Sequence, residues 1–274
     1  PDDVSLSFLP YAHVLGRIES WGHIYIGYQL AFAESIDRVR NNLAEIRPTF
    51  LMSVPRIFEK IFAGINSQLG NNPAKRALFK WAVQVGKKAG EYKLNREPIP
   101  LPLFAQLQVA NKLVLSKIKE AFGGRLRFAV SGGAPIAKEI EEFFHACGIL
   151  ILEGYGLTET TAAICVNTPF DYKFGSVGKP IGDTQLKIAA DGEILIKSKK
   201  VMKEYYKDPK ATQEVFEAGW FKTGDIGEIS ASGDLKITDR KKDLIKTAGG
   251  KYVAPQKLEN LLKTQPLIAQ AVIH

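Results

Sequence analysis

The segment 125–153 limits the fold more than any other part of the sequence. Leu126–Val130 predicts a short strand. The loop Ser131–Pro135 follows it, and its proline suits the first turn of a helix, where a missing N–H costs nothing. Ile149–Leu152 predicts the next strand and Gly154–Gly156 another loop. Between the strands, a helical stripe of apolar residues ends at a helix-terminating glycine: Ile136, Ile140, Phe143, Phe144, Cys147, then Gly148. A strand, a helix and a strand within about 30 residues indicate a βαβ unit with a buried parallel sheet.

The rest of the chain changes character from helices to short strands. Residues 4–123 are mostly helical in pattern, with short apolar strands such as Thr49–Val54. Beyond Cys165, short strands separated by Asp-Gly and Ser-Gly-Asp turns predict antiparallel β structure: Gln185–Ala189, Gly192–Lys197, Gly227–Ser230 and Leu235–Thr238. After Arg240 come a charged connector, a strand around Leu244–Lys246 and a helix from Pro255 to about Thr264.

These patterns predict an α/β fold in three parts. Parallel-sheet α/β layers with helices occupy 1–165, and a β-rich subdomain of the same domain occupies 166–239. A hinge and the beginning of a small α+β C-terminal domain occupy 240–274. The sequence begins at Pro1 without Met and stops inside an apolar run, so both ends are expected to lie within a longer protein.

Basic residues concentrate in one stretch. The net charge is +8, and residues 74–127 hold twelve Lys or Arg against three Glu. A solvated helical face, nucleic acid, anionic lipid and an anionic cofactor are all open interpretations of that excess. No signal peptide and no apolar run of about 20 residues is present. The two cysteines, Cys147 and Cys165, match no metal or disulfide pattern, which favours a reducing cytoplasmic compartment.

Two loops lie where ligands bind in open α/β sheets, at the carboxyl ends of strands. The Gly-Gly turn in Ser131–Pro135 lets a flat ring approach the backbone closely. In Gly154–Thr161, Tyr155 offers a stacking surface, hydroxyls could hold phosphate, and Glu159 could hold Mg²⁺. Asp225, after a glycine, could accept both hydrogen bonds of a ribose diol. Each loop taken singly is also compatible with ordinary turn and capping residues.

Taken together, the ordered motifs resemble the adenylate-forming superfamily of acyl-CoA synthetases, firefly-type luciferases and peptide-synthetase adenylation domains. The resemblance rests first on Tyr155–Thr160, Thr223–Asp225 and Asp239–Ile245. Four further segments fit the same family: 9–14, 175–180, 205–212 and 249–255. Within the superfamily, Ser53–Lys60 and the basic helical stretch after it are similar to long-chain fatty acyl-CoA synthetases.

The resemblance implies ATP-dependent activation of a long-chain fatty acid to acyl-AMP, followed by transfer to CoA. Tyr155 and Gly156 would lie at the adenine, Thr158 would contact the α-phosphate, and Glu159 would coordinate Mg²⁺. Asp225 would bind the ribose hydroxyls, assisted by Arg240. The remaining adenine contacts are implied at Gly133, Ala134 and Pro135.

The acyl and CoA contacts are implied elsewhere. His13 would position the carboxylate or gate the acyl tunnel, and Lys242 falls at the hinge between domains. Gly249 and Gly250 would approach the pantetheine of CoA. The family's phosphate loop and catalytic lysine are expected outside these 274 residues, so the fragment alone is expected to be inactive.

Three interpretations of the function therefore stand. The first is a fatty acid–CoA ligase in the cytoplasm, with peripheral contact to anionic membrane at the inner face through residues 74–127 and no nucleic-acid partner. The second is a fatty acyl-AMP ligase that serves a carrier protein. The third is a non-catalytic basic module that binds membranes or nucleic acid.

Overall fold

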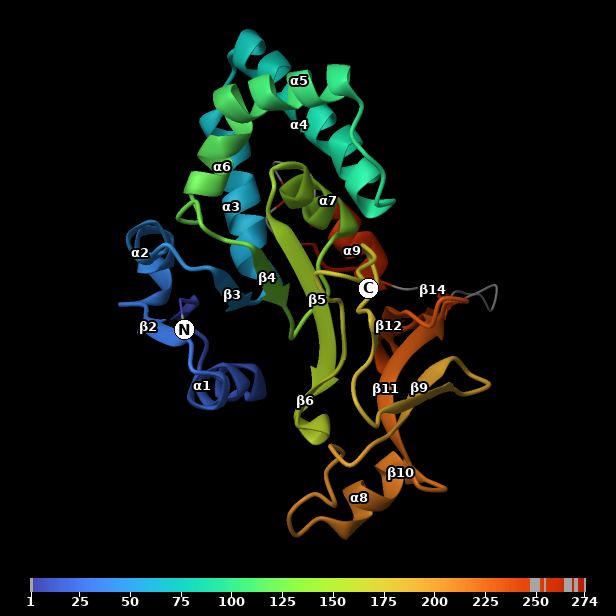
Figure 1. Cartoon of the computed structure of the whole chain (residues 1–274). Helices are drawn as coiled ribbons and strands as arrows, with labels where there is room; N and C mark the ends of the chain where they lie inside the picture. Colours follow the sequence, from blue (N-terminus) through green and yellow to red (C-terminus); the bar gives the residue numbers. More distant parts are fainter. Residues whose placement is uncertain (1, 247–251, 254, 264–267, 269–270, 274) are drawn as a thin grey trace. The chain divides into compact units, whose positions relative to one another are not determined.

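The computed structural model describes residues 2–246, 252–253, 255–263, 268 and 271–273. The chain forms two compact units, Pro1–Leu152 and Glu153–His274. Strand β5, Leu150–Leu157, begins in the first unit and continues into the second. Figure 1 labels the helices and strands and colours them along the sequence, from blue at the N-terminus to red at the C-terminus.

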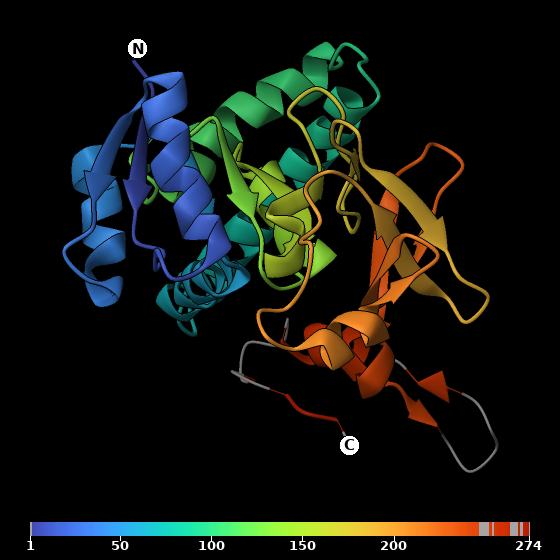
Figure 2. The same ribbon diagram turned by 90° about the horizontal axis from the view of Figure 1, so that it is seen from below.

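Short parallel strands form the centre of the first unit. β1 (Val4–Ser7) pairs in parallel with β2 (Gln29–Phe32), and α1 (Val14–Ile26) packs beside this pair (Figure 2). β3 (Phe50–Ser53) pairs in parallel with β4 (Phe128–Ser131), and β5 follows β4 in the strand order. The parallel layers expected from the sequence are therefore confirmed.

Helices pack against these strands and against one another. They are α2 (Val39–Ile46), α3 (Pro55–Gln68), α4 (Pro73–Leu94), α5 (Leu101–Ala110), a π-helical segment (Asn111–Leu115), α6 (Ser116–Glu120) and α7 (Lys138–Ala146). Four phenylalanine rings join α3, α7 and the end of α6 in the core: Phe58, Phe122, Phe143 and Phe144. The Phe58 and Phe144 ring centroids lie 6.0 Å apart, edge to face, the geometry that aromatic pairs prefer.

A glycine lets the long helix α4 lie close against α7. A Cβ at Gly86 would lie 2.3 Å from the Ala146 carbonyl oxygen, closer than two such atoms can approach. Gly86 is buried, and so are its neighbours on the same face of α4, Ala82, Val85 and Ala89. The small side chains on this face therefore set the distance between the two helices.

The second unit contains antiparallel sheets. β6 (Ala162–Val166) runs antiparallel to β5, and β7 (Lys179–Pro180) extends that sheet. A second sheet has the order β10 (Phe216–Glu217), β11 (Trp220–Ile229), β9 (Glu193–Lys197), β8 (Gln185–Ile188), with β12 (Leu235–Arg240) paired to β11.

α8 (Pro209–Val215) precedes β10. The short strands β13 (Ile245–Lys246) and β14 (Tyr252–Val253) pair, and α9 spans Pro255–Lys263. The antiparallel prediction is confirmed.

Two local predictions were wrong. Gly154–Gly156, expected as a loop, lies within β5 and pairs with β6 through a β-bulge at Tyr155 and Gly156. A Cβ at Gly156 would lie 1.9 Å from the Ala162 carbonyl oxygen, so only glycine allows β6 to lie this close. Helix α7 begins at Lys138 rather than at Pro135, because the extended segment before it buries Ile136 and Ala137 in the core.

The close contact at Gly86 predicts a specific loss of stability. Gly86→Ala should lower the free energy of unfolding by about 1–3 kcal/mol, because the added methyl group meets backbone rather than a movable side chain. Urea unfolding monitored by circular dichroism measures the change. Gly64→Ala in α3 is the matched control, since a Cβ there meets nothing within 4 Å. It should raise stability by about 0.5–1 kcal/mol. Equal effects of the two substitutions would contradict the packing argument.

Candidate functional site

A buried carboxylate lies at the centre of the second unit's polar contacts. The Tyr155 hydroxyl, on β5, donates a hydrogen bond of 2.5 Å to Asp225 Oδ2, on β11. Arg240 is the cross-strand partner of Asp225 on β12, and its Nε lies 3.6 Å from Asp225 Oδ1. The structure thus brings together three residues that the sequence proposed for one nucleoside site.

Burial determines the electrostatics of this group. Asp225 is 6% exposed, and its burial raises the pKa of the carboxyl, while the Tyr155 hydroxyl and the Arg240 guanidinium oppose that rise. Burial, followed by the neighbouring Asp225 charge, raises the pKa of the Tyr155 phenol, which therefore remains a donor. The Oδ1 atom of Asp225 faces the Arg240 guanidinium.

The sequence placed Asp225 after a glycine turn, either as a ribose ligand or as a turn-capping residue, but it lies inside the long strand β11. The pairing of β11 with β9 shifts register between Lys222 and Ile226, so the strand is irregular at Thr223–Asp225. The Thr223 hydroxyl accepts from the Asp225 amide (3.0 Å) and donates to the Ile194 carbonyl (2.8 Å). These bonds fix the segment that carries the carboxylate.

Glu193 and Lys241 support the same segment, and the sequence analysis missed both. Glu193 Oε1 accepts from the Gly224 amide at 2.8 Å, and Glu193 Oε2 lies 2.7 Å from Lys241 Nζ. Lys241 Nζ also lies 2.7 Å from Asp191 Oδ2, and these bonds raise the pKa of Lys241 and lower that of Asp191. Glu193 is the first residue of β9, directly before the apolar run Ile194–Ile196, and a charged residue at a strand end is ordinary, so no pattern in the sequence singled it out.

The residues after β5 form a tight 3₁₀ turn, Thr158–Thr160. The buried Thr160 hydroxyl accepts from the Leu157 amide (2.8 Å) and donates to the Ala162 carbonyl (2.8 Å). Thr161 and Ala162 both have positive φ, 53° and 72°, which non-glycine residues rarely adopt. Such backbone outliers persist only where the surrounding structure holds them, and they cluster at functional sites.

Glu159 is oriented by two contacts from the segment that precedes α8. The Tyr205 hydroxyl donates to Glu159 Oε1 at 2.8 Å, and the Met202 amide donates to the Glu159 carbonyl at 2.7 Å. Burial and the bond to Glu159 raise the pKa of Tyr205 to about 12. Tyr205 is a third residue for which the sequence analysis had proposed no role.

The surroundings of Glu159 fit a magnesium ion held with a nucleotide. Its second carboxylate oxygen accepts no hydrogen bond from the described residues. Within the described ranges there is no group of three or more His, Cys, Asp or Glu side chains that could hold a metal. Mg²⁺ is commonly bound through one or two carboxylates together with substrate phosphates, and Glu159 can supply one such oxygen.

The other candidate residues lie at the ends of elements. Gly133 and Ala134 are exposed and Pro135 is half-buried in the loop after β4, all in the first unit, and Gly133 has φ 82°. His13 is exposed in the first unit, at the start of α1. Lys242 is exposed in the 3₁₀ turn that follows β12. Gly249 and Gly250 lie outside the described residues.

Comparison with known proteins shows the family. The model of the AMP-binding enzyme family matches residues 1–206, and the chain belongs to that family. It is 42% identical to the long-chain-fatty-acid–CoA ligase FadD15 of Mycobacterium bovis over 98% of this chain and 44% of that protein. It is 38% identical to long chain acyl-CoA synthetase 1 of Arabidopsis thaliana, over 95% of this chain and 41% of the relative. The chain thus spans less than half the length of these relatives, and the resemblance found in the sequence is confirmed.

Solved structures agree with this assignment. The adenylation domain of a carboxylic acid reductase from Segniliparus rugosus, solved with AMP and a carboxylic acid, matches with a TM-score of 0.72 at 26% identity. The match covers 98% of this chain and 39% of that one. An o-succinylbenzoate CoA synthetase from Bacillus subtilis shares the fold, with a TM-score of 0.68 at 23% identity, over 98% and 47% of the two chains.

The contact between Tyr155 and Asp225 predicts a pH-dependent change in stability. Tyr155→Phe should cost about 1.5–3 kcal/mol at pH 7, the usual contribution of a hydrogen bond to a charged group. The hydroxyl stabilises the ionised carboxylate, so the variant's folded pKa for Asp225 should be higher. The loss should therefore shrink as pH falls through the folded pKa of Asp225.

Chemical unfolding at several pH values between 4 and 7 measures this difference. Tyr206→Phe is the matched control, because that side chain is 84% exposed and should show almost no loss at any pH. A Tyr155→Phe loss that is constant with pH would contradict a bond to an ionised carboxylate.

Proposed function

We propose that the intact protein is an AMP-forming long-chain fatty acid–CoA ligase. It would use ATP to convert a fatty acid to acyl-AMP and then transfer the acyl group to CoA. The observation that carries the proposal is the contact of Tyr155, Asp225 and Arg240 in a chain of the AMP-binding enzyme family. The names of its relatives, at 42% and 38% identity, support the long-chain substrate.

Asp225 would bind the ribose of the nucleotide. Its Oδ2 is oriented by Tyr155, and its Oδ1 could accept from a ribose hydroxyl while Arg240 offsets the charge. The Arg240 side chain is 52% exposed, so it can also reach a bound ligand. In the first unit, Gly133, Ala134 and Pro135 would border the adenine.

Glu159 would act at the phosphates. Its carboxylate would hold Mg²⁺, which would supply positive charge against the phosphoryl oxygens as negative charge builds on them. The exposed Thr158 hydroxyl is placed one residue earlier in the same strained turn and would contact the α-phosphate. The fixed geometry of that turn means that little reorganisation is needed during the reaction.

The acyl and CoA steps would involve the remaining candidates. His13 would position the fatty acid carboxylate. Lys242 would serve as the pivot of the small domain between the two half-reactions, with Gly249 and Gly250 near the CoA pantetheine. We propose that the 274-residue chain by itself forms no acyl-AMP.

Glu159→Gln tests the phosphate role. In the intact protein it should slow pyrophosphate release with palmitate by about 10²–10³-fold, the usual effect of removing one well-placed electrostatic group. Its melting temperature should be unchanged, because Gln can still accept the Tyr205 hydroxyl. Glu214→Gln, on the exposed side of α8, is the matched control and should retain full activity.

Three results would contradict the proposal. The first is near-normal pyrophosphate release by Glu159→Gln. The second is AMP release that requires a carrier protein instead of CoA. The third is turnover by the 274-residue chain alone. The second result would favour an acyl-AMP ligase that serves a carrier.

We also propose a peripheral contact with anionic membrane through residues 74–127. Beside the basic residues, this stretch exposes large apolar side chains: Leu78, Leu94, Leu101, Phe104, Val109 and Leu113. Interleaved basic and apolar groups suit the boundary of a bilayer. In the part of the chain that the structure describes, no helix is long and apolar enough to cross a membrane.

Replacing five basic residues of α4 with Gln should lower the affinity for anionic liposomes, measured by sedimentation, by at least about tenfold. Each basic residue near a membrane surface contributes about 1 kcal/mol to binding. The five residues are Lys75, Arg76, Lys80, Lys87 and Lys88. The effect should stay below the full sum, since Lys87 already pairs with Glu142 at 3.1 Å. A control with the same charge change replaces five exposed lysines of the second unit: Lys187, Lys197, Lys199, Lys203 and Lys210. Equal sedimentation of both variants would leave a solvated face as the explanation.

A further inference from the structure

The turn that carries Glu159 is bonded to one segment of the second unit, residues 198–208, which joins β9 to α8. The Met202 amide donates to the Glu159 carbonyl at 2.7 Å, and the Thr161 hydroxyl donates to the Lys200 carbonyl at 2.8 Å. Both bonds fix the backbone of the turn. A third bond reaches the carboxylate itself, because the Tyr205 hydroxyl donates to Glu159 Oε1 at 2.8 Å.

The 198–208 segment is itself anchored, so Tyr205 has a fixed place. The Lys200 ammonium donates to the Ala163 carbonyl at 3.1 Å and to the Ile181 carbonyl at 3.3 Å. At the other end, the Tyr205 amide donates to the Thr212 hydroxyl of α8 at 2.9 Å. The backbone of Tyr205 is therefore tied to a helix, and its side chain is half-buried.

The bond from Tyr205 gives the two oxygens of Glu159 different surroundings. Oε1 is engaged by the hydroxyl, whereas Oε2 accepts no hydrogen bond from any residue in the described ranges. A carboxylate with one oxygen engaged offers a metal ion one oxygen instead of two. Mg²⁺ is small and demands near-ideal octahedral coordination, whereas the larger Ca²⁺ accepts a carboxylate through one oxygen or through both. The arrangement at Glu159 therefore suits the smaller ion.

We infer that Tyr205 is a positioning residue that makes Glu159 selective for Mg²⁺ over Ca²⁺. Its hydroxyl holds one oxygen of the carboxylate and leaves the other for the metal. Hydrogen bonds to a ligating carboxylate orient it, and loss of such a partner typically lowers metal affinity about 10–100-fold. The inference rests on the proposed role of Glu159 at the phosphates of ATP.

Titration calorimetry of the intact protein with Mg²⁺·ATP and with Ca²⁺·ATP, in the absence of fatty acid, measures this selectivity apart from turnover. In Tyr205→Phe, Mg²⁺·ATP should bind at least about tenfold more weakly. Ca²⁺·ATP should lose less affinity, because the freed Oε1 lets both oxygens bind the larger ion. The preference for Mg²⁺ over Ca²⁺ should therefore fall.

AMP titrated in metal-free buffer gives a reference that does not involve Glu159. Its affinity should be the same in Tyr205→Phe as in the unaltered protein, because Tyr155 and Arg240 hold the proposed ribose ligand, Asp225. Unchanged AMP binding also establishes that the variant is folded.

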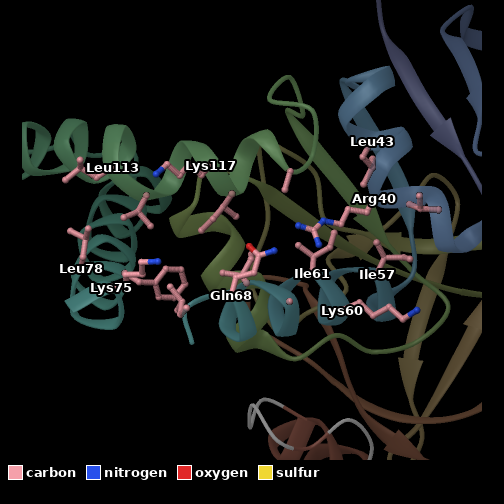
Figure 3. Close-up of a pocket in the computed structure, with 18 of the residues that line it drawn as sticks. Arg40, Leu43, Ile57, Lys60, Ile61, Gln68, Lys75, Leu78, Leu113 and Lys117 are labelled. Atoms are coloured by element: carbon pink, nitrogen blue, oxygen red, sulfur yellow. The ribbon is translucent and has the colours of Figure 1, made fainter. Parts of the chain in front are cut away.

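Two control variants accompany Tyr205→Phe. Tyr206→Phe makes the same change in the adjacent residue, which is 84% exposed, and should alter neither metal–ATP affinity. Ile61→Val shortens a side chain that lines a cavity of about 770 Å³ between α2, α3, α4 and α6 in the first unit (Figure 3). No residue that bonds to Glu159 lines this cavity, so the variant should lower stability without changing the metal preference.

Combining Tyr205→Phe with Glu159→Gln shows whether Tyr205 acts through the carboxylate. The second substitution should weaken Mg²⁺·ATP no further than Glu159→Gln alone, because both remove the same interaction. Equal and additive losses in the two backgrounds would contradict a role through Glu159.

The variants separate failure of the inference from failure of the proposed function. An unchanged ratio of Mg²⁺ to Ca²⁺ affinity in Tyr205→Phe, or an equal loss of AMP binding, would overturn the inference. The proposed function would still stand if Glu159→Gln weakened Mg²⁺·ATP in the same experiment. Glu159→Gln that binds Mg²⁺·ATP as tightly as the unaltered protein would refute the role of Glu159 and the inference together.

Discussion

The burial of one carboxylate, that of Asp225, is the constraint on which the second unit's site depends. A buried charge is costly unless donors surround it, and this one has the Tyr155 hydroxyl on one oxygen and the Arg240 guanidinium near the other. These contacts join the consecutive strands β11 and β12 to β5, which lies about 70 residues earlier in the chain. The polar group that would recognise a ligand is thus also the group that fixes how these strands meet.

Close backbone packing gives the molecule its second constraint. Gly156 allows β6 to return along β5, and the positive φ angles of Thr161 and Ala162 make the reversal between these strands possible. The strain is held by the Thr160 hydroxyl, which bonds on both sides of the turn. The same backbone that makes the reversal therefore presents Glu159 toward Tyr205.

The sequence predicted the fold class because the patterns that indicate it are local, and it named Tyr155, Asp225 and Arg240, which the structure brings together. The helical stripe from Ile140 to Phe144 and the order of the motifs need no knowledge of distant contacts. Gly154–Gly156 was mistaken for a loop because glycine is rare in strands, whereas pairing with β6 overrides that preference. The bond from Tyr155 to Asp225 spans 70 residues, and that from Lys241 to Glu193 spans 48, so neither is visible in a local pattern.

Glu193 links the segment that carries Lys241 to the backbone beside Asp225. One of its oxygens holds Lys241 and the other holds the Gly224 amide, so the two segments share a single rigid connector. The lysine is half-exposed, and dissolved ions compete with such a pair, whereas the buried carboxylate is shielded from them. Added salt should therefore weaken the ion pair between Lys241 and Glu193 before it affects the bond from the Gly224 amide to Glu193. Through buried Glu193, ionic strength can thus influence the backbone beside Asp225.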